Sequence, residues 1–158
     1  MDIFSSAKAK ALAIIRKYEG LLKDNKHGTV SAYLDPVGIP TIGYGTIRYA
    51  SGVAVRMGDT ITYQQANDEL HFEVDAVIRS IDSMVKVPIT SNQKAALISF
   101  TYNLGAGTLQ TSTLLKLLNG NADKKTVAAE FDKWVKAGGN TLAGLVKRRA
   151  EEKQTFLS

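Results

Sequence analysis

Three residues in the first third of the chain carry the side chains that hydrolysis of a glycosidic bond requires. Glu19 precedes a glycine, and Asp35 and Thr41 stand on either side of a short segment that contains Pro36 and Gly38. In such a reaction one protonated carboxyl gives its proton to the leaving oxygen, and an ionised carboxylate activates water or supports the transition state. A hydroxyl group can fix the position of that water. The simpler interpretation is that Glu19 is a solvated helix carboxylate and Asp35 begins a tight turn.

The elements predicted around these residues are a helix that carries Glu19 and a hairpin that carries Asp35 and Thr41. Apolar residues at helical spacing predict a helix over residues 6–25, which carries Glu19 near its end. Residues 26–60 are rich in glycine and contain three β-rich runs, Val30–Leu34, Pro40–Tyr44 and Val53–Met57. They predict a small antiparallel hairpin sheet, with Asp35 and Thr41 on opposite strands and facing one groove.

The rest of the chain is predicted to be helical. Thr62 with Gln65, and Thr90 with Gln93, fit capping boxes at the starts of two helices. A helix over 62–85 would span about 36 Å, which is long enough to join two lobes. The helix that begins near Thr90 should stop at Gly105. Three more helices are predicted over residues 110–119, 124–137 and 141–157.

The fold class is therefore predicted as α+β, a single domain over residues 1–158 with a groove between two lobes. The β-rich N-terminal lobe covers about 15–61 and the connecting helix about 62–85. The helical lobe covers about 86–158 and includes the N-terminal helix. A groove between two lobes can accept an extended polymer.

Composition excludes several classes of function. The 158 residues carry a net charge of +5, no cysteine and only two histidines, His27 and His71. A zinc amidase or zinc peptidase would need more metal ligands, so we expect no metal and no cofactor. The basic residues are dispersed, which argues against a nucleic-acid partner. No apolar run reaches the length of a membrane span or a secretory signal, so we expect synthesis in the cytoplasm and no stable membrane insertion.

The motifs around these residues resemble the phage-type lysozymes, glycoside hydrolase family 24, which includes the T-even phage lysozymes. Glu19-Gly20 and the run from Ala32 to Gly45 are similar to the family signature. The resemblance continues through further segments along nearly the whole chain, namely 93–97, 99–105, 112–115, Phe131 with Trp134, and 137–149.

The resemblance implies a lysozyme-like fold and an inverting hydrolysis of the bond between N-acetylmuramic acid and N-acetylglucosamine in bacterial peptidoglycan. Glu19 would be the acid, and Asp35 and Thr41 would hold and activate the water. The segment between Glu19 and Asp35 is longer than is usual in the family. We expect the extra residues to lie within 22–31, as a longer turn or an extended helix. Asp24 is an alternative acid, but no threonine follows it at the spacing of Asp35 and Thr41.

The resemblance also implies substrate contacts from Ile47, Tyr102 and Thr113, although core packing is an equal alternative for Tyr102. Trp134 is interpreted as a core residue. The basic run Lys147–Arg149 is interpreted partly as a solvated face and partly as a surface that attracts the anionic cell wall.

The predicted partner is peptidoglycan, attacked in the periplasm by a monomer that causes cell lysis, with export through a phage membrane-pore protein. Two alternatives stay open at this point. One is a catalytically inactive wall-binding module. The other is a basic membrane disruptor that acts through an amphipathic C-terminal helix.

Overall fold

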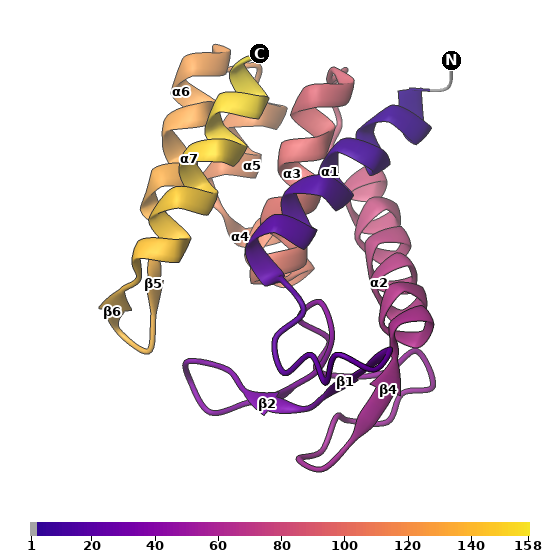
Figure 1. Cartoon of the computed structure of the whole chain (residues 1–158). Coiled ribbons are helices and arrows are strands. Elements are labelled where there is room, and N and C mark those ends of the chain that lie inside the picture. Colours follow the sequence, from indigo (N-terminus) through magenta and orange to yellow (C-terminus); the bar gives the residue numbers. More distant parts are fainter. Residues whose placement is uncertain (1–2) are drawn as a thin grey trace.

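The computed structural model describes residues 3–158, with side chains from residue 6 onward, as an α+β protein (Figure 1). The helices are α1 (Ile3–Glu19), α2 (Tyr63–Met84), α3 (Ser91–Leu104), α4 (Ala106–Thr111), α5 (Thr113–Asn119), α6 (Lys124–Ala129), the 3-10 turn η1 (Glu130–Lys133) and α7 (Ala143–Leu157). The strands are β1 (Thr29–Ser31), β2 (Tyr33–Leu34), β3 (Pro40–Thr41), β4 (Thr60–Thr62), β5 (Lys136–Ala137) and β6 (Asn140–Thr141). Figure 1 shows β1, β2 and β4 gathered at the lower end of α1 and α2, below the other helices.

Both predicted capping boxes are confirmed. The Thr62 hydroxyl accepts a hydrogen bond from the Gln65 backbone N–H at 3.0 Å, and the Gln65 side chain accepts from the Thr62 N–H at 2.8 Å. Thr90 and Gln93 make the same pair of bonds at the start of α3. Because each box satisfies two backbone donors, it fixes where its helix begins. Helix α2 lies one residue inside the predicted range at each end, and α3 ends at Gly105 as expected.

The prediction that the first helix extends to residue 25 is wrong. Helix α1 ends at Glu19, and Gly20 takes a left-handed conformation with φ +63°. The Gly20 N–H still donates to the Arg16 carbonyl at 3.0 Å, which closes the last turn. Glycine adopts this conformation at little cost, so it ends the helix one residue after the carboxylate. The helix end thus sets the position of Glu19.

Two of the predicted C-terminal helices also differ from the structure. The helix expected over 110–119 is divided at Ser112, whose hydroxyl caps α5 by accepting from the Leu115 N–H at 3.1 Å. The helix expected over 124–137 stops earlier, and its last residues form the β5–β6 hairpin. The turn of this hairpin holds Gly138 and Gly139, both with positive φ, a conformation that favours a hairpin turn over a helix.

The β-rich segment forms two small antiparallel sheets. Strand β2 pairs with β3 as expected, with Tyr33 opposite Thr41. Strand β1 pairs with the distant β4, which the sequence pattern did not predict. The run Val53–Met57 forms no strand of its own and contributes one bridge, between Arg48 and Ala54. The pairing of β1 with β4 brings the two ends of the β-rich segment together, and the β2–β3 hairpin projects from this pair of strands.

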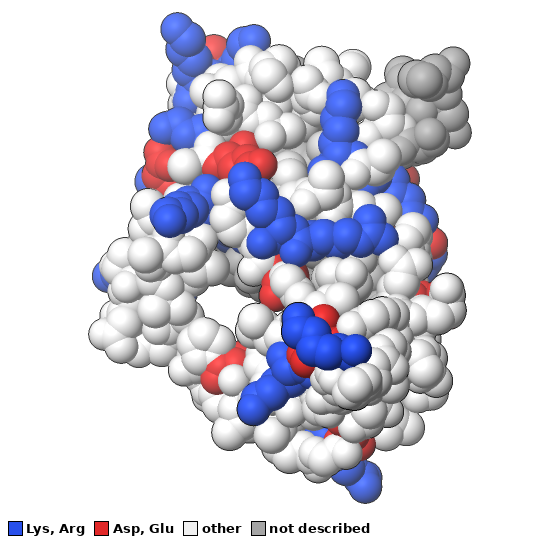
Figure 2. Space-filling model, viewed as in Figure 1, with Lys and Arg blue, Asp and Glu red and all other residues white. Residues whose placement is uncertain are grey.

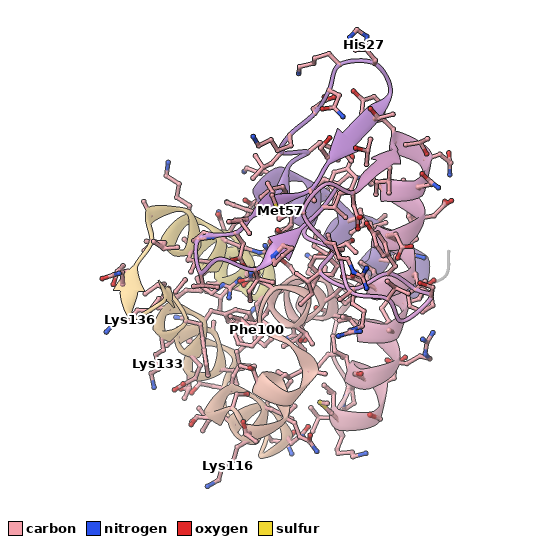
Figure 3. The ribbon with its side chains drawn as sticks, turned by 90° about the horizontal axis from the view of Figure 1, so that it is seen from below. His27, Met57, Phe100, Lys116, Lys133 and Lys136 are labelled. Atoms are coloured by element: carbon pink, nitrogen blue, oxygen red, sulfur yellow. The ribbon has the colours of Figure 1, made fainter. Side chains whose placement is uncertain are left out.

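Buried apolar residues form two clusters, one among the helices and one between the β-rich segment and the start of α2. The larger cluster joins α1, α2, α3 and the C-terminal helices, and the smaller one is built on Val30, Ile42 and Ala66. Phe100 is fully buried in the larger cluster, with ring centroids 5.4 Å from Phe131 and 5.9 Å from Trp134. Figure 3 shows Phe100 among the helices. Phe131 of η1 also contacts Phe156 of α7, with ring centroids 5.6 Å apart, so aromatic packing joins α3, η1 and α7.

Candidate active site

A cleft of about 650 Å³ lies between the β-rich segment and the helices. Figure 2 shows the molecule hollowed between an upper and a lower half. Five of the six predicted site residues line the cleft, namely Glu19, Asp35, Thr41, Ile47 and Tyr102. A volume in the range of ligand pockets, open between two halves, suits a segment of a polymer.

Glu19 projects from the end of α1 into the cleft beside a buried cation. Its Oε1 accepts a hydrogen bond from Arg148 Nη1 at 2.6 Å. The Arg148 side chain is 3% exposed and that of Glu19 is 18% exposed. Arg148 also donates to the Ser99 carbonyl at 3.1 Å. Because the guanidinium is itself fixed, it holds the Glu19 carboxyl in one position.

Asp35 lies at the turn between β2 and β3. Its Oδ1 accepts hydrogen bonds from the Val37 N–H at 2.9 Å and the Ile39 N–H at 2.8 Å. The turn closes with a bond from the Gly38 N–H to the Asp35 carbonyl, which confirms the predicted turn. Both backbone donors use the same carboxylate oxygen, so Oδ2 remains available for a water molecule or a substrate.

Thr41 lies in β3, opposite Tyr33 and almost fully buried. Its hydroxyl donates to the Ile39 carbonyl at 2.8 Å, which leaves its lone pairs free to accept a bond from water. Burial raises the pKa of Tyr33 to about 12, and the negative charges of Glu19 and Asp35 add to this effect. Both carboxylates therefore lie within electrostatic reach of the same tyrosine.

Gly45 packs directly against the Glu19 carboxylate. A methyl group at this position would come within 2.6 Å of Glu19 Oε2, closer than non-bonded atoms approach. The backbone φ of +89° also favours glycine. We expect Gly45→Ala to displace Glu19; if Glu19 is the acid that the family resemblance implies, the hydrolytic rate should fall by on the order of 10²-fold, the cost of misplacing a catalytic group by about 1 Å.

Gly52 provides the matched control for this substitution. It has a similar φ of +92°, but a methyl group there would meet nothing within 4 Å. Gly52→Ala carries the same backbone strain without the clash, so comparing hydrolysis rates for the two variants separates the two effects. Equal rates for both variants would mean that contact with Gly45 does not position Glu19.

The interpretation of Lys147–Arg149 as an exposed basic run is wrong for two of its three residues. Only Lys147 is exposed, whereas Arg148 is 2% and Arg149 0% exposed. The fully buried Glu152 forms ion pairs with Arg148 Nε at 3.3 Å and with Arg149 Nε at 2.8 Å. Ser99 Oγ donates to the same carboxylate at 2.7 Å. This network ties α7 to α3 directly behind the residue that holds Glu19.

Glu73 and Tyr102 form a second polar group in the cleft. Burial, with smaller contributions from the negative charges of Glu69 and Glu19, raises the pKa of Glu73 to about 7. Burial also raises the pKa of Tyr102 well above its usual value. Tyr102 donates its hydroxyl proton to the Tyr44 carbonyl at 2.6 Å. Tyr102 therefore has a packing role and also lines the cleft.

Two candidate residues lie outside the cleft. Thr113 begins α5 and lines a separate surface hollow with Gln110, Lys116 and other residues of α4 and α5, and it is not among the residues that line the cleft. Asp24 accepts hydrogen bonds from Tyr63 and from the Lys26 N–H, and the bond from Tyr63 is the main cause that lowers its pKa. A low pKa outside the cleft does not suit a general acid.

The long segment between Glu19 and Asp35 forms a loop that turns away from the helices. Ser31 donates its N–H to the Lys23 carbonyl, and the Asn25 N–H donates to the Thr29 carbonyl. Figure 3 shows His27 at the outer tip of this loop. The extra length therefore projects from the β-rich segment, and Glu19 and Asp35 still line one cleft.

Sequence reasoning missed Glu73, Arg148 and Glu152 as members of the site. A signal was present for two of them. Glu73 follows Leu70 by three residues on the apolar stripe of α2, and Glu152 stands four residues after Arg148 on α7. Among residues 3–158, no group of three or more histidine, cysteine or acidic side chains is arranged to hold a metal ion.

Comparison with known proteins gives the family. Residues 18–152 match the family described as phage lysozyme. The endolysin of Acyrthosiphon pisum secondary endosymbiont phage 1 is 39% identical over 153 residues, covering 94% of this chain and 96% of the relative. The endolysin of Bacillus phage PZA is 40% identical over 146 residues, covering 92% of this chain and 52% of the relative. This chain thus spans about half the length of the Bacillus phage relatives it matches.

A solved structure confirms the lysozyme-like fold. The endolysin from Escherichia coli O157:H7 phage FAHEc1 aligns with a TM-score of 0.80 and 38% sequence identity, covering 94% of this chain and 91% of that one. The family match extends from the residue before Glu19 to Glu152, and it therefore contains every residue of the cleft discussed above. The chain belongs to the phage lysozyme family.

Proposed function

We propose that this protein is a muramidase that hydrolyses the β-1,4 bond between N-acetylmuramic acid and N-acetylglucosamine in bacterial peptidoglycan. The observation that carries the proposal is that Glu19, Asp35 and Thr41 line one cleft between the two halves of a phage lysozyme fold. Two carboxyl groups and a hydroxyl beside a polymer-sized groove are the set that glycoside hydrolysis needs.

In this proposal Glu19 protonates the leaving glycosidic oxygen. The guanidinium of Arg148, 2.6 Å from Glu19 Oε1, then stabilises the carboxylate that remains after the proton has left. Asp35 uses the oxygen that makes no backbone bond to accept a proton from water, and the Thr41 hydroxyl accepts a second bond that orients this water. Water attack from the face opposite the leaving group would invert the anomeric carbon.

Apolar side chains on both walls would hold the sugar rings. Ile47 is 50% exposed on the lower wall, and Leu142 and Leu145 line the helical wall. Tyr102 also lines the cleft. We propose Ile47 and Tyr102 as substrate contacts and leave Thr113 out of the set.

Digestion of purified sacculi tests the proposal. Products with reducing N-acetylmuramic acid ends, identified by mass spectrometry, are expected from hydrolysis. Early release of the α-anomer, followed by NMR, is expected from inversion at the β-linked carbon. Released peptides, 1,6-anhydro ends, or binding to sacculi without release of reducing ends would contradict the muramidase assignment.

The route to the cell wall is a separate proposal. No helix among residues 3–158 is long and apolar enough to cross a membrane. Relatives from Bacteriophage PS119 and others are named SAR-endolysins. We propose that the protein is made in the host cytoplasm and reaches the periplasm through a phage membrane-pore protein. Lysis on co-expression with such a pore, and none without it, is the expected result.

A further inference from the structure

Tyr33 lines the cleft and has no part in the proposed mechanism. It lies in β2, where its Cα pairs with that of Thr41 in β3. Residues that face one another across an antiparallel pair project from the same face, with Cβ atoms about 4.5–5.5 Å apart. Successive residues of a strand point to opposite faces, and the pairing continues to Asp35, whose N–H donates to the Ile39 carbonyl. Tyr33, Asp35 and Thr41 therefore project together toward the cleft.

The other face of the same hairpin is turned to solvent. Leu34 pairs with Pro40 and is 56% exposed, and neither of these residues lines the cleft. Tyr33, one residue earlier, is partly buried. The alternation of the strand thus separates a solvent face from a cleft face, and the tyrosine belongs to the cleft face.

The hydroxyl of Tyr33 is the exception among the hydroxyls of the cleft. Among the described residues, four side chains with hydroxyl groups line the cleft, namely Tyr18, Thr41, Tyr102 and Tyr33. The first three donate their proton within the protein, to the Glu151 carboxylate, the Ile39 carbonyl and the Tyr44 carbonyl respectively. No described residue accepts a hydrogen bond from Tyr33. A phenol has one proton to donate, so Tyr33 has this proton available for a ligand.

The charges near Tyr33 determine what kind of acceptor suits it. Burial is the main cause that raises the pKa of Tyr33 to about 12, and the negative charges of Glu19 and Asp35 add to this effect. The phenol is therefore a neutral donor at pH 7. The same two charges repel an anionic group of a substrate that approaches Tyr33. An uncharged acceptor is favoured at this position.

The place of Tyr33 in the cleft identifies the part of the sugar that it meets. In the proposed function, the water held by Asp35 and Thr41 attacks the anomeric carbon of N-acetylmuramic acid. The next ring carbon carries the 2-acetamido group. Its amide carbonyl is uncharged and is a strong hydrogen-bond acceptor, as a backbone carbonyl is.

We propose that Tyr33 is a specificity-determining residue whose hydroxyl donates a hydrogen bond to the 2-acetamido carbonyl of the N-acetylmuramic acid at the cleavage site. The bond holds this sugar with its anomeric carbon beside the water, and it favours N-acetylated over N-deacetylated glycan. This inference rests on the proposed muramidase function and adds the substrate group that the hairpin recognises.

A thermodynamic cycle between enzyme and substrate tests the proposal. The substrates are soluble, peptide-free glycan fragments whose muramic acid acetyl group is either intact or removed. On the intact glycan, Tyr33→Phe is expected to lower kcat/KM by about 2–10-fold, the effect of losing one neutral hydrogen bond. The loss should fall on KM, because the bond forms when the sugar binds. On the deacetylated glycan the wild type and Tyr33→Phe should have equal kcat/KM, and the effect of the new ammonium group cancels in their ratio.

Tyr18→Phe is the matched control for this cycle. It also removes a phenol hydroxyl from the cleft, but the proton of that hydroxyl already goes to Glu151. Any loss in this variant should be the same on both glycans. Phenylalanine keeps the aromatic ring of Tyr33, and an unchanged urea midpoint for Tyr33→Phe checks that the hairpin is intact.

Binding provides a readout that does not depend on hydrolysis. In the Glu19→Gln background, isothermal titration calorimetry with the intact fragments is expected to show the same weakening of about 2–10-fold when Tyr33 is replaced by phenylalanine. With the deacetylated fragments, the replacement should leave Kd unchanged.

The outcomes separate this inference from the muramidase proposal. An equal loss for Tyr33→Phe on both glycans, or no loss on either, would overturn the assignment of Tyr33. A displaced pH profile with unchanged KM would also overturn it, because the phenol would then act on Glu19 or Asp35 and not on the sugar. A wild type that releases no reducing ends from either glycan, but shows the acetyl-dependent difference in binding, would instead overturn the muramidase assignment and retain the contact.

Discussion

Replacing Glu19 with glutamine is expected to lower the rate of glycan hydrolysis by on the order of 10²–10⁴-fold, the usual contribution of a general acid. In the wild type, Arg148 donates to Glu19 at 2.6 Å. Glutamine has nearly the same shape as glutamate, and its amide oxygen can accept the same bond. It has no proton to give at an accessible pH, so the loss falls on chemistry. Reducing-end release from sacculi, with circular dichroism to check the fold, measures this effect.

Asp24→Asn is the control for removal of an acidic side chain near Glu19. Asp24 lies outside the cleft and is held by bonds from Tyr63 and the Lys26 N–H, so this variant should keep nearly full activity. Unchanged lysis by Glu19→Gln would contradict the assignment of Glu19 as the acid and would favour the membrane-disruption alternative. Loss of activity in Asp24→Asn alone would move the acid role to Asp24.

The sequence was sufficient to predict the features that depend on local patterns. Capping boxes require only a threonine and a glutamine three residues apart, and both predicted boxes are present. The turn after Asp35 follows from its proline and glycine, and β2 and β3 pair across it. Local rules therefore placed Asp35 and Thr41 on one hairpin, and the family resemblance added Glu19, which lines the same cleft.

The features that could not be predicted depend on contacts between distant segments. Arg148 meets Glu19 across 129 positions of sequence, and no spacing rule reports such a pair. The pattern Lys147–Arg149 therefore suggested a solvated face, although two of its side chains turn inward. The close approach of Gly45 to Glu19 likewise requires the β-rich segment to be folded against the end of α1.

The largest loss of stability is expected from Glu152→Ala. Glu152 is fully buried, pairs with Arg148 and Arg149, and accepts a bond from Ser99. Burial raises the pKa of Glu152 and lowers that of Arg149 to about 10, so the charges are costly to bury even when paired. Removing only the Glu152 carboxylate leaves the Arg149 guanidinium buried, with the Asn103 side chain as its remaining hydrogen-bond acceptor among the described residues. Breaking a buried pair in this way costs about 3–5 kcal/mol.

Urea unfolding at pH 7 measures the effect, and Asp132→Ala is the matched control. Asp132 pairs with Lys153 at 2.6 Å on the surface, where both side chains are at least one-third exposed, and such pairs contribute about 0–1 kcal/mol. A Glu152→Ala variant no less stable than Asp132→Ala would show that the buried network does not hold α7 to α3. Because Arg148 belongs to the same network, Glu152→Ala should also loosen Glu19 and slow hydrolysis in the fraction that remains folded. The stability of the helical half and the geometry of the acid are therefore set by the same buried charges.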